Sequence, residues 1–303
     1  MAKSSRLEHH DQDRSARTAS QKLPKAWAVL NQQIRQCQAC PRLISHCQQI
    51  ATVKRKAYVE HSYWGGPVEN FVGTAPIESS TIDDSSSQLV TNMAGKISRK
   101  TKPENRQQRD LLIVGLAPGA HGANRTGRMF TGDRSGDWLY RALNRGGFAS
   151  QANSVDRSDG MILHDCVITA VCHCAPPDNK PTTEEIQACQ NFLETTVGLG
   201  QPKVILALGK IAWDATARLM RQQPQLFDYA SSNTPTKTKS PAPAILDKSN
   251  NRKVAFGHGQ TWKFADHLAL VGSYHPSQQN TFTGRLTEEM LDQVIQLVHD
   301  LLD

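Results

Sequence analysis

Four short apolar runs, which alternate with stretches of helical spacing, constrain the fold of this chain more than any other feature. The runs span residues 111–114, 167–171, 204–208 and 268–271, and the helical stretches span 137–145, 182–197, 210–221 and 287–302. Apolar runs of this length without alternating polar residues are typical of strands that are buried on both faces. Strands that alternate with helices predict a parallel sheet, so we expect an α/β fold with three layers, α/β/α, around a central four-stranded parallel sheet.

The second helical stretch carries signals for both of its ends. Thr182 precedes Glu184 and Glu185, and acidic residues in a first turn are typical of a helix start. Gly198 predicts the end, because glycine adopts the left-handed conformation after a helix at little cost. We therefore expect this helix to end at Val197.

The segments around this pattern differ in composition from it. Residues 1–25 mix both charges with Ser and Gln and predict a disordered tail, whereas residues 26–50 have helical spacing that is broken at Cys40-Pro41. Two low-complexity stretches, at about 74–109 and 231–253, are too polar to bury much apolar surface. We interpret them as solvated insertions in a single domain over residues 26–303.

The charge balance and the apolar content limit the classes of protein. Thirty-five Lys and Arg against 28 Asp and Glu give a formal net charge of +7, which suits a polyanion partner. No run approaches the ~20 apolar residues that span a bilayer, and the N-terminus has no apolar signal-peptide core. Seven cysteines, an odd number, argue against a disulfide framework. We therefore expect a cytoplasmic protein with no membrane segment, in which clustered cysteines bind metal or lie in the core.

The site of such a fold lies at the carboxyl ends of its strands, which singles out three loops. The first loop, residues 115–136, contains six glycines, which let the backbone approach a ligand closely. It has neither a GxGxxG fingerprint nor the Gly-Lys-Ser/Thr of a phosphate-binding loop. On the residues alone, a ligand site and an ordinary glycine-rich turn are equally good interpretations.

The second loop carries cysteines. Cys172 and Cys174 are followed by three prolines and then by Cys189, and Cys37-x-x-Cys40 lies far upstream. A Cys-x-x-Cys pair with two distant cysteines supplies four thiolates, enough for zinc or an iron–sulfur cluster. Spacing does not choose between Cys172 and Cys174, and unligated cysteines are the alternative. Cys47 and Cys166 have no partner at metal spacing, so we expect them to be buried as small apolar residues.

The third loop begins after the last apolar run and contains His275, directly before a proline. A lone histidine is usually structural. A rigid position at the mouth of a site, however, suits a neutral imidazole that donates a hydrogen bond to a developing anion.

Together the three loops resemble the uracil-DNA glycosylase superfamily, and most closely its family 5, the iron–sulfur enzymes called type B. The resemblance covers most of residues 26–300. The matching segments are residues 115–128, 130–133, 174–181 and 275–277 with Asn280, Thr283 and Gly284, and further 63–65, 208–213 and 256–259. It implies a DNA repair enzyme that hydrolyses the N-glycosidic bond of uracil, and also of deaminated purines such as hypoxanthine, in double- and single-stranded DNA.

The resemblance also implies a [4Fe–4S] cluster. By position, the family's ligands correspond to Cys37, Cys40, Cys174 and Cys189, and the cluster would tie the N-terminal helical segment to the second loop. Zinc in the same four thiolates is an alternative that the sequence leaves open.

The chain departs from related sequences at several positions. Leu116 and Ala117 stand where sister families carry an acid, which is normal for family 5 but removes the obvious general base. His173 replaces a frequent Arg or Lys, and Ala170 replaces a frequent Asn of the second strand. The last change puts base recognition at that strand in doubt.

Glycosidic cleavage builds positive charge on the sugar and negative charge on the leaving base. We expect His275 to donate to the leaving base, with a bracing role as the alternative. Asp133 is the candidate for orienting water or stabilising the sugar cation, unless it only caps the helix that starts near Ser135. Asn124 is a second candidate for holding water.

The remaining predictions concern substrate and DNA. The expected residues of the base pocket are Gly115, Ala117, Gly119, Phe130 and Asn280. The expected DNA contacts are Arg125, Arg128, Arg134 and Arg285 to phosphates, and Gln278 and Gln279 in the gap that the flipped base leaves. We expect a monomer.

Three other functions are alternatives to this one. A non-catalytic DNA-binding protein on the same scaffold would fit the missing acid and Ala170. A nucleotide- or sugar-binding enzyme of another doubly wound type would need a phosphate fingerprint, which the chain lacks. An iron–sulfur electron carrier would have no use for the first and third loops.

Overall fold

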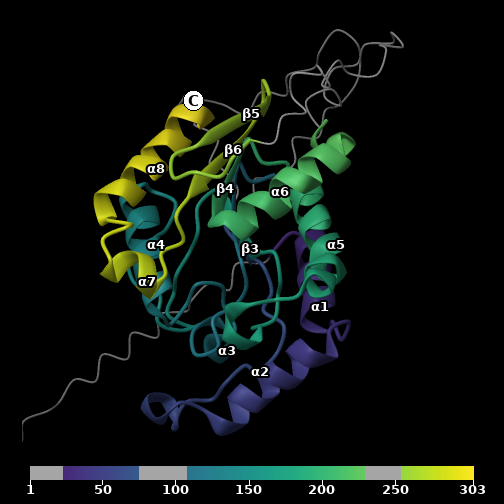
Figure 1. Ribbon diagram of the computed structural model, residues 1–303, viewed down its shortest axis with the longest axis vertical. Helices are drawn as coiled ribbons and strands as arrows, with labels where there is room; N and C mark the ends of the chain where they lie inside the picture. Colours follow the sequence, from purple (N-terminus) through teal and green to yellow (C-terminus); the bar gives the residue numbers. More distant parts are fainter. Residues whose placement is uncertain (1–22, 75–107, 229–253) are drawn as a thin grey trace, which may run out of the picture.

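The computed structural model describes residues 23–74, 108–228 and 254–303 (Figure 1). Apart from a few residues at their edges, the predicted tail at 1–25 and the predicted insertions at 74–109 and 231–253 lie outside these ranges. In the described part of the chain, no helix is long and apolar enough to cross a membrane.

A six-stranded sheet in the order β1-β3-β2-β4-β6-β5 forms the centre of the molecule. Its four inner strands are β3 (Cys166–Ala170), β2 (Leu111–Gly115), β4 (Val204–Leu208) and β6 (Leu268–Ser273), and neighbours among them pair in parallel. The edge strands β1 (Phe71–Val72) and β5 (Thr261–Ala265) pair antiparallel with β3 and β6. The α/β class is therefore confirmed, but the expected four-stranded parallel sheet is corrected to a mixed sheet of six strands.

The four inner strands are apolar throughout because every residue in them is buried. Leu112 and Val114 of β2 face one apolar core, and Leu111 and Ile113 face the other. Side chains of successive strand residues point to opposite faces, so both faces of the sheet must be covered.

Helices cover the two faces separately (Figure 1). The helices α4 (Arg134–Arg145) and α8 (Glu288–Leu302) pack on the face of Leu111 and Ile113. The helices α1 (Lys25–Arg35), α5 (Thr183–Gly200) and α6 (Lys210–Gln222) cover the opposite face. The molecule therefore has the three layers that the alternating pattern predicts.

The ends of α5 test the predicted capping signals. The Thr182 side chain accepts from the backbone N–H of Glu185, and the Glu185 side chain accepts from that of Thr182, so the predicted start is confirmed. The predicted end at Gly198 is wrong, since the helix continues to Gly200 and Gln201 adopts the left-handed conformation. A glycine inside a helix costs only about 1 kcal/mol, which the packing of this helix on the sheet outweighs.

The N-terminal segment consists of α1 and of α2 (Pro41–Val53), and the predicted break at Cys40-Pro41 is confirmed. Trp27 of α1 is fully buried in the core. Arg42 of α2 makes a two-pronged ion pair with Glu185, with both nitrogen–oxygen distances 2.7 Å. Packing and this ion pair therefore join the segment to α5.

Short helices complete the structure. They are η1 (Lys56–Tyr58), α3 (Ala123–Thr126), η3 (Pro177–Asn179), η4 (Pro224–Phe227) and α7 (Gln278–Phe282). In the chain, α3 follows β2 and α7 follows β6, so both lie beyond the carboxyl ends of parallel strands (Figure 1).

Candidate active site

The three loops singled out by the sequence leave the same edge of the sheet. The backbone N–H of Val171 donates to the carbonyl of Gly115, which joins the ends of β3 and β2. The N–H of Gly209, after β4, donates to the carbonyl of Ser273 at the end of β6. The edge therefore brings together loops that are more than a hundred residues apart in the sequence.

Phe130 connects the first loop to the third. A Cβ atom on Gly115 would lie 2.8 Å from the Phe130 ring, so only glycine lets this ring rest on the end of β2. The ring centroid of Phe130 lies 5.8 Å from that of His275, with the two planes tilted by 32°. Phe130 also has a φ of 53°, in the left-handed region that non-glycine residues rarely adopt. Strain of this kind persists where the surroundings fix the conformation, often at functional sites.

His275 is held by its backbone, and its ring is left free. Its carbonyl accepts from the Asn280 side chain at 2.8 Å and from the Ser277 N–H at 2.7 Å. Within the described ranges, neither ring nitrogen has a hydrogen-bond partner in the protein. Burial lowers the pKa of His275 to about 4, so the imidazole is neutral at pH 7. A neutral ring carries one N–H donor and one acceptor. Asn280 braces this loop through its amide nitrogen, and its contact with substrate stays a prediction.

The two oxygens of Asp133 have different surroundings, which bears on its two predicted roles as a helix cap and as a catalytic group. One carboxylate oxygen accepts from the Gly136 N–H at 3.0 Å and caps α4. The other oxygen lies against the first loop, where a Cβ atom on Gly119 would come within 2.8 Å of it and one on Gly122 would overlap with it. Burial raises the pKa of Asp133, and the hydrogen bond from Gly136 acts in the opposite direction. The glycines of the first loop thus make room for a carboxylate.

Asn124 lies where α3 meets α2. Its side chain is fully buried, and its amide nitrogen donates to the carbonyls of Cys47, at 3.3 Å, and Ala120, at 3.4 Å. Its amide oxygen is buried and has no hydrogen-bond partner among the described residues, so the predicted role in holding water stays a prediction.

Arg125 and Arg128 have partners within the protein, and their predicted contacts with phosphates stay a prediction. Arg125 donates to the carbonyls of His121 and Gly132 at 2.8 Å and 2.7 Å. Arg128 pairs with Asp159 at 2.6 Å and donates to the Ser154 hydroxyl at 2.7 Å. Both residues are 6% exposed, so their donors hold the first loop from within the protein.

Arg134 and Arg285 are exposed, as a DNA-contacting role requires. The guanidinium of Arg134 lies 4.4 Å from the ring centre of Phe282, and that of Arg285 lies 4.6 Å from the ring centre of Tyr274. Gln278 and Gln279 are also exposed, on α7. Phe282, at 67% exposure, is a surface aromatic of this rim that the sequence analysis did not single out.

The four predicted cluster ligands lie in one region of the molecule. Cys37 and Cys40 are in the turn between α1 and α2, Cys174 is in the second loop, and Cys189 is on α5. Burial, and then the charges of Cys189 and Cys37, raise the pKa of Cys40, so these three thiols are neighbours. Within residues 23–74, 108–228 and 254–303, no three His, Cys, Asp or Glu side chains lie close enough to hold a metal ion.

Two further thiols border this region. The hydrogen bond with Cys47 is the main cause that raises the pKa of Cys174, and the hydrogen bond with Cys172 is the main cause that lowers the pKa of Cys189. Cys47 and Cys166 are fully buried, as predicted. The four predicted ligands are all thiols, from the α1–α2 turn, the second loop and α5, and such a set fits the chemistry of an iron–sulfur cluster.

A segment before β1 covers the outside of the first loop. The Tyr63 hydroxyl lies 2.9 Å from Nδ1 of His121, and the backbone N–H of Trp64 donates to the carbonyl of Arg125 at 2.9 Å. The Gly65 N–H donates to the Asn124 carbonyl at 3.0 Å. The sequence analysis noted Tyr63-Trp64-Gly65 as a family segment, but only the structure places it on the first loop.

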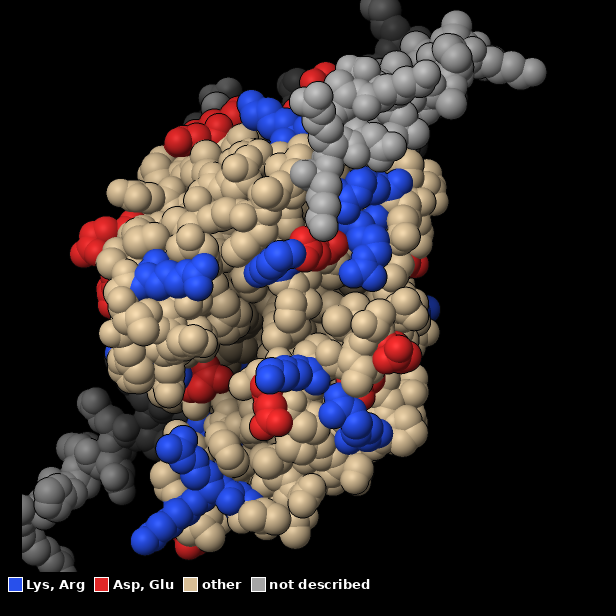
Figure 2. Space-filling model, viewed as in Figure 1, with Lys and Arg blue, Asp and Glu red and all other residues tan. Residues whose placement is uncertain are grey.

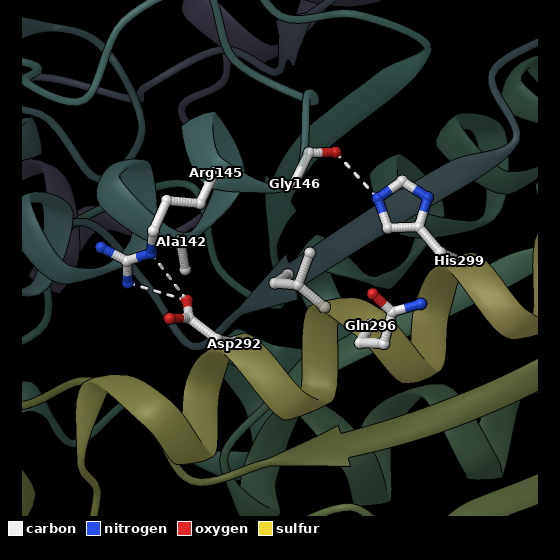
Figure 3. A pocket seen from close by; sticks show the side chains of 7 residues that line it. Ala142, Arg145, Gly146, Asp292, Gln296 and His299 are labelled. Carbon is white, nitrogen blue, oxygen red and sulfur yellow. Dashed lines mark hydrogen bonds and ion pairs between the residues drawn. The ribbon is translucent and has the colours of Figure 1, made fainter.

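A separate pocket of about 260 Å³ lies between α4 and α8 (Figure 3). Its charged groups already bind one another, since Arg145 donates to Asp292 at 2.7 Å and His299 meets the Gly146 carbonyl at 2.8 Å. None of the three loops contributes to its lining, so we do not assign the chemistry to it.

The fold and the loops define a class: an α/β enzyme whose site, at the carboxyl edge of parallel strands, combines a neutral imidazole with a half-buried carboxylate. The model of the uracil DNA glycosylase superfamily matches residues 103–299. The chain belongs to that superfamily.

Relatives refine this placement. The Type-5 uracil-DNA glycosylase of Mycobacterium leprae is 40% identical over 267 residues, which are 88% of this chain and 91% of that protein. The Type-5 enzyme of Thermus thermophilus is 35% identical over 262 residues, which are 86% of this chain and 90% of that protein. The Type-4 uracil-DNA glycosylase of Pyrobaculum aerophilum is 36% identical over only 118 residues, 39% of this chain and 53% of that protein.

Proposed function

We propose that this chain is a DNA repair enzyme that hydrolyses the N-glycosidic bond between uracil and deoxyribose in DNA and leaves an abasic site. One observation supports this above all: the free, neutral imidazole of His275 stands beside the Phe130 ring at the carboxyl edge of the sheet. The extensive similarity to Type-5 uracil-DNA glycosylases supports the same substrate.

His275 acts on the leaving group. As the glycosidic bond breaks, the electron pair of the bond moves onto the base, and negative charge develops on its carbonyl oxygen. A neutral imidazole can donate its N–H to that oxygen without losing a proton in the ground state. One well-placed donor of this kind contributes roughly 3–4 kcal/mol to transition-state stabilisation.

Asp133 acts on the sugar side. The oxygen that lies against the glycine-rich loop would attract the developing oxocarbenium ion or orient the attacking water. The oxygen that caps α4 keeps the carboxylate from turning away. Leu116 and Ala117 offer no acid, so Asp133 is the carboxylate of this loop that remains for the task.

The base pocket is formed by the first loop and the end of β2. Phe130 offers an aromatic face on which a flipped base can stack. The backbone of Gly115, Ala117 and Gly119 would line the pocket beside that face. No charged side chain stands at Leu116 or Ala117 to select one base. We therefore extend the proposal to hypoxanthine and other deaminated bases.

DNA binding completes the proposal. Flipping a base out of a duplex costs a few kcal/mol, less at a mispair or in a single strand. Gln278 and Gln279 on α7 are exposed where they can fill the vacated space, and Arg134 and Arg285 can neutralise flanking phosphates. The protein acts as a monomer on double- and single-stranded DNA.

Cys37, Cys40, Cys174 and Cys189 would hold a [4Fe–4S] cluster. When bound, the cluster would link the N-terminal segment to the second loop through its cysteine ligands, which is a structural role. Zinc is distinguished from the cluster by the iron and acid-labile sulfide content of the purified protein, which we expect at four of each per chain.

A single-turnover assay tests the activity. Labelled duplex and single-stranded oligonucleotides with one uracil are incubated with excess protein, and hot alkali then cuts at abasic sites. Cleavage at uracil supports the proposal, and replacing uracil by hypoxanthine tests the breadth of the pocket. Binding of the same DNA without cleavage would instead support a non-catalytic DNA-binding protein.

A further inference from the structure

Lys54, Arg55 and Lys56 form a run of three cations between α2 and η1. Lys54 has a φ of 55°, which ends α2, and its ammonium group donates to the Val59 carbonyl at 3.0 Å. Arg55 and Lys56 are exposed. The turn is thus folded back on itself by Lys54, and it leaves two neighbouring charges in solvent.

These two charges differ from the eight Lys and Arg side chains of the described residues that are paired with acids. Neither Arg55 nor Lys56 makes an ion pair within the residues that the structure describes. The paired cations are Arg35, Arg42, Arg128, Arg141, Arg145, Arg157, Lys203 and Lys210. A surface that leaves adjacent cations unpaired keeps them available for a polyanion.

The turn is fastened to the first loop. The N–H of Tyr58 donates to the Arg55 carbonyl at 2.7 Å, and the Tyr58 ring lies 4.2 Å from the guanidinium carbon of Arg125. Further along, Tyr63 contacts His121 of the same loop. Burial first, and then the charges of Arg55 and Arg125, lower the pKa of His121, which agrees with Arg55 lying close to the loop.

The space-filling view agrees with this placement. Lys and Arg side chains gather at the lower left of Figure 2, where Figure 1 shows the chain that follows α2. The first loop also carries Phe130 and Asp133, so these charges lie on a segment that contacts a loop of the candidate site.

We propose that Arg55 and Lys56 form a phosphate-binding site that holds the DNA backbone against the outside of the first loop. This inference rests on the proposed function, because it assigns the DNA strand of that substrate to a second contact region. It is separate from Arg134 and Arg285, which lie at the start of α4 and after α7. Two contact regions hold a strand in register while one nucleotide leaves the stack.

The salt dependence of binding tests the proposal. The variant R55Q/K56Q removes both charges, and K25Q/K263Q removes two exposed lysines of α1 and β5 as a matched control. R55K/K56R keeps the charge. The probe is a duplex with one tetrahydrofuran abasic-site analogue, titrated by fluorescence anisotropy across a series of KCl concentrations.

Each neutralised phosphate contributes about 0.9 to the slope of log K against log salt. We expect R55Q/K56Q to lower that slope by about 2 and to weaken binding roughly tenfold at about 0.1 M salt. The control and R55K/K56R should both keep the slope of the unmodified protein. An unchanged slope in R55Q/K56Q, or an equal loss in R55K/K56R or in the control, overturns the proposal.

Failure of this site and failure of the proposed function give different results. If the unmodified protein excises uracil but R55Q/K56Q keeps its salt slope, the function stands and the site is wrong. If no protein excises uracil but the slope falls in R55Q/K56Q alone, the site stands and the function is wrong. Circular dichroism of each variant checks that the fold is retained.

Discussion

The first and third loops leave the same edge of the sheet, but they use their polar residues in opposite ways. In the first loop, Asn124, Arg125 and Arg128 are buried and fasten the backbone from within. In the third loop, the His275 ring has no hydrogen-bond partner among the described residues, and Gln279 is exposed. The first loop is a rigid floor, and the third is an open rim. Polar residues of one motif can therefore be used to hold the backbone, while those of a neighbouring motif are left open to solvent.

The largest expected effect is a loss of folding stability when a buried ion pair of the first loop is removed. Arg128→Met removes the partner of Asp159, whose carboxylate side chain is only 7% exposed. An unpaired buried charge is costly, so we expect a loss of about 3–5 kcal/mol in the free energy of unfolding, measured by urea denaturation. Arg285→Met on the rim is the matched change and should cost less than about 0.5 kcal/mol. Equal losses in the two variants would contradict the distinction between floor and rim.

The next effect concerns the rim alone. His275→Ala should slow single-turnover cleavage by about 10²- to 10³-fold, because the leaving base loses its donor. Binding of the abasic analogue and the urea midpoint should change little. His46→Ala, at a half-buried histidine of α2, is the control. A normal cleavage rate in His275→Ala would remove His275 from the mechanism.

The pH dependence of stability compares a structural histidine with the candidate donor. Burial lowers the pKa of both His173 and His275 to about 4, below the unfolded value of about 6.5. The unfolded chain then binds more protons between these values, so the stabilisation is complete above pH 6.5 and is lost as the pH falls towards 4. Each residue contributes up to roughly 3 kcal/mol to this loss.

Urea unfolding between about pH 4 and pH 7 measures this loss of stability, because the folded and unfolded pKa values of the two histidines lie near the ends of that range. His173→Gln should remove about half of the slope of stability against pH and leave the pH profile of cleavage unchanged. His275→Ala should remove a comparable part of the slope. A slope that neither substitution reduces would show that the two rings are not buried as neutral groups.

The smallest expected effect concerns exposed charge. Arg134→Gln combined with Arg285→Gln should lower the salt slope of DNA binding by about 2, with a several-fold loss of affinity. The free energy of unfolding should change by less than about 0.5 kcal/mol, because both side chains are on the surface. The K25Q/K263Q protein is again the control, and an equal change in it would show that only net charge matters.

Much of the fold could be predicted because burial on both faces leaves a simple signal. The four inner strands and the Thr182 cap are of this kind. The two edge strands were not predicted, each for a different reason. Phe71–Val72 is too short to show a pattern, and Thr261–Ala265 alternates buried and exposed residues as an edge permits. The end of α5 was predicted too early, because the packing of this helix on the sheet outweighs the cost of a glycine at position 198.

The site was harder to predict from sequence, because a residue type does not show which way its side chain points. Arg125 and Arg134 are nine residues apart in one loop, but one is buried and the other exposed. The sequence allows Asp133 to be a cap or a catalytic group, and only the structure shows that one oxygen caps α4 while the other lies against Gly119 and Gly122. The turn at Arg55 carries no motif, so nothing in the sequence analysis pointed to it.

The docking of α2 onto distant parts of the chain has a consequence for synthesis. Arg42 pairs with a residue 143 positions later, and Cys47 contacts the carbonyl of Ala175, 128 positions later. The N-terminal helices therefore leave the ribosome long before their partners exist. At roughly 5–20 residues per second, they wait for many seconds with the apolar face of Trp27 and Leu43 uncovered. This protein depends on these helices remaining unaggregated until Ala175 and Glu185 have been translated.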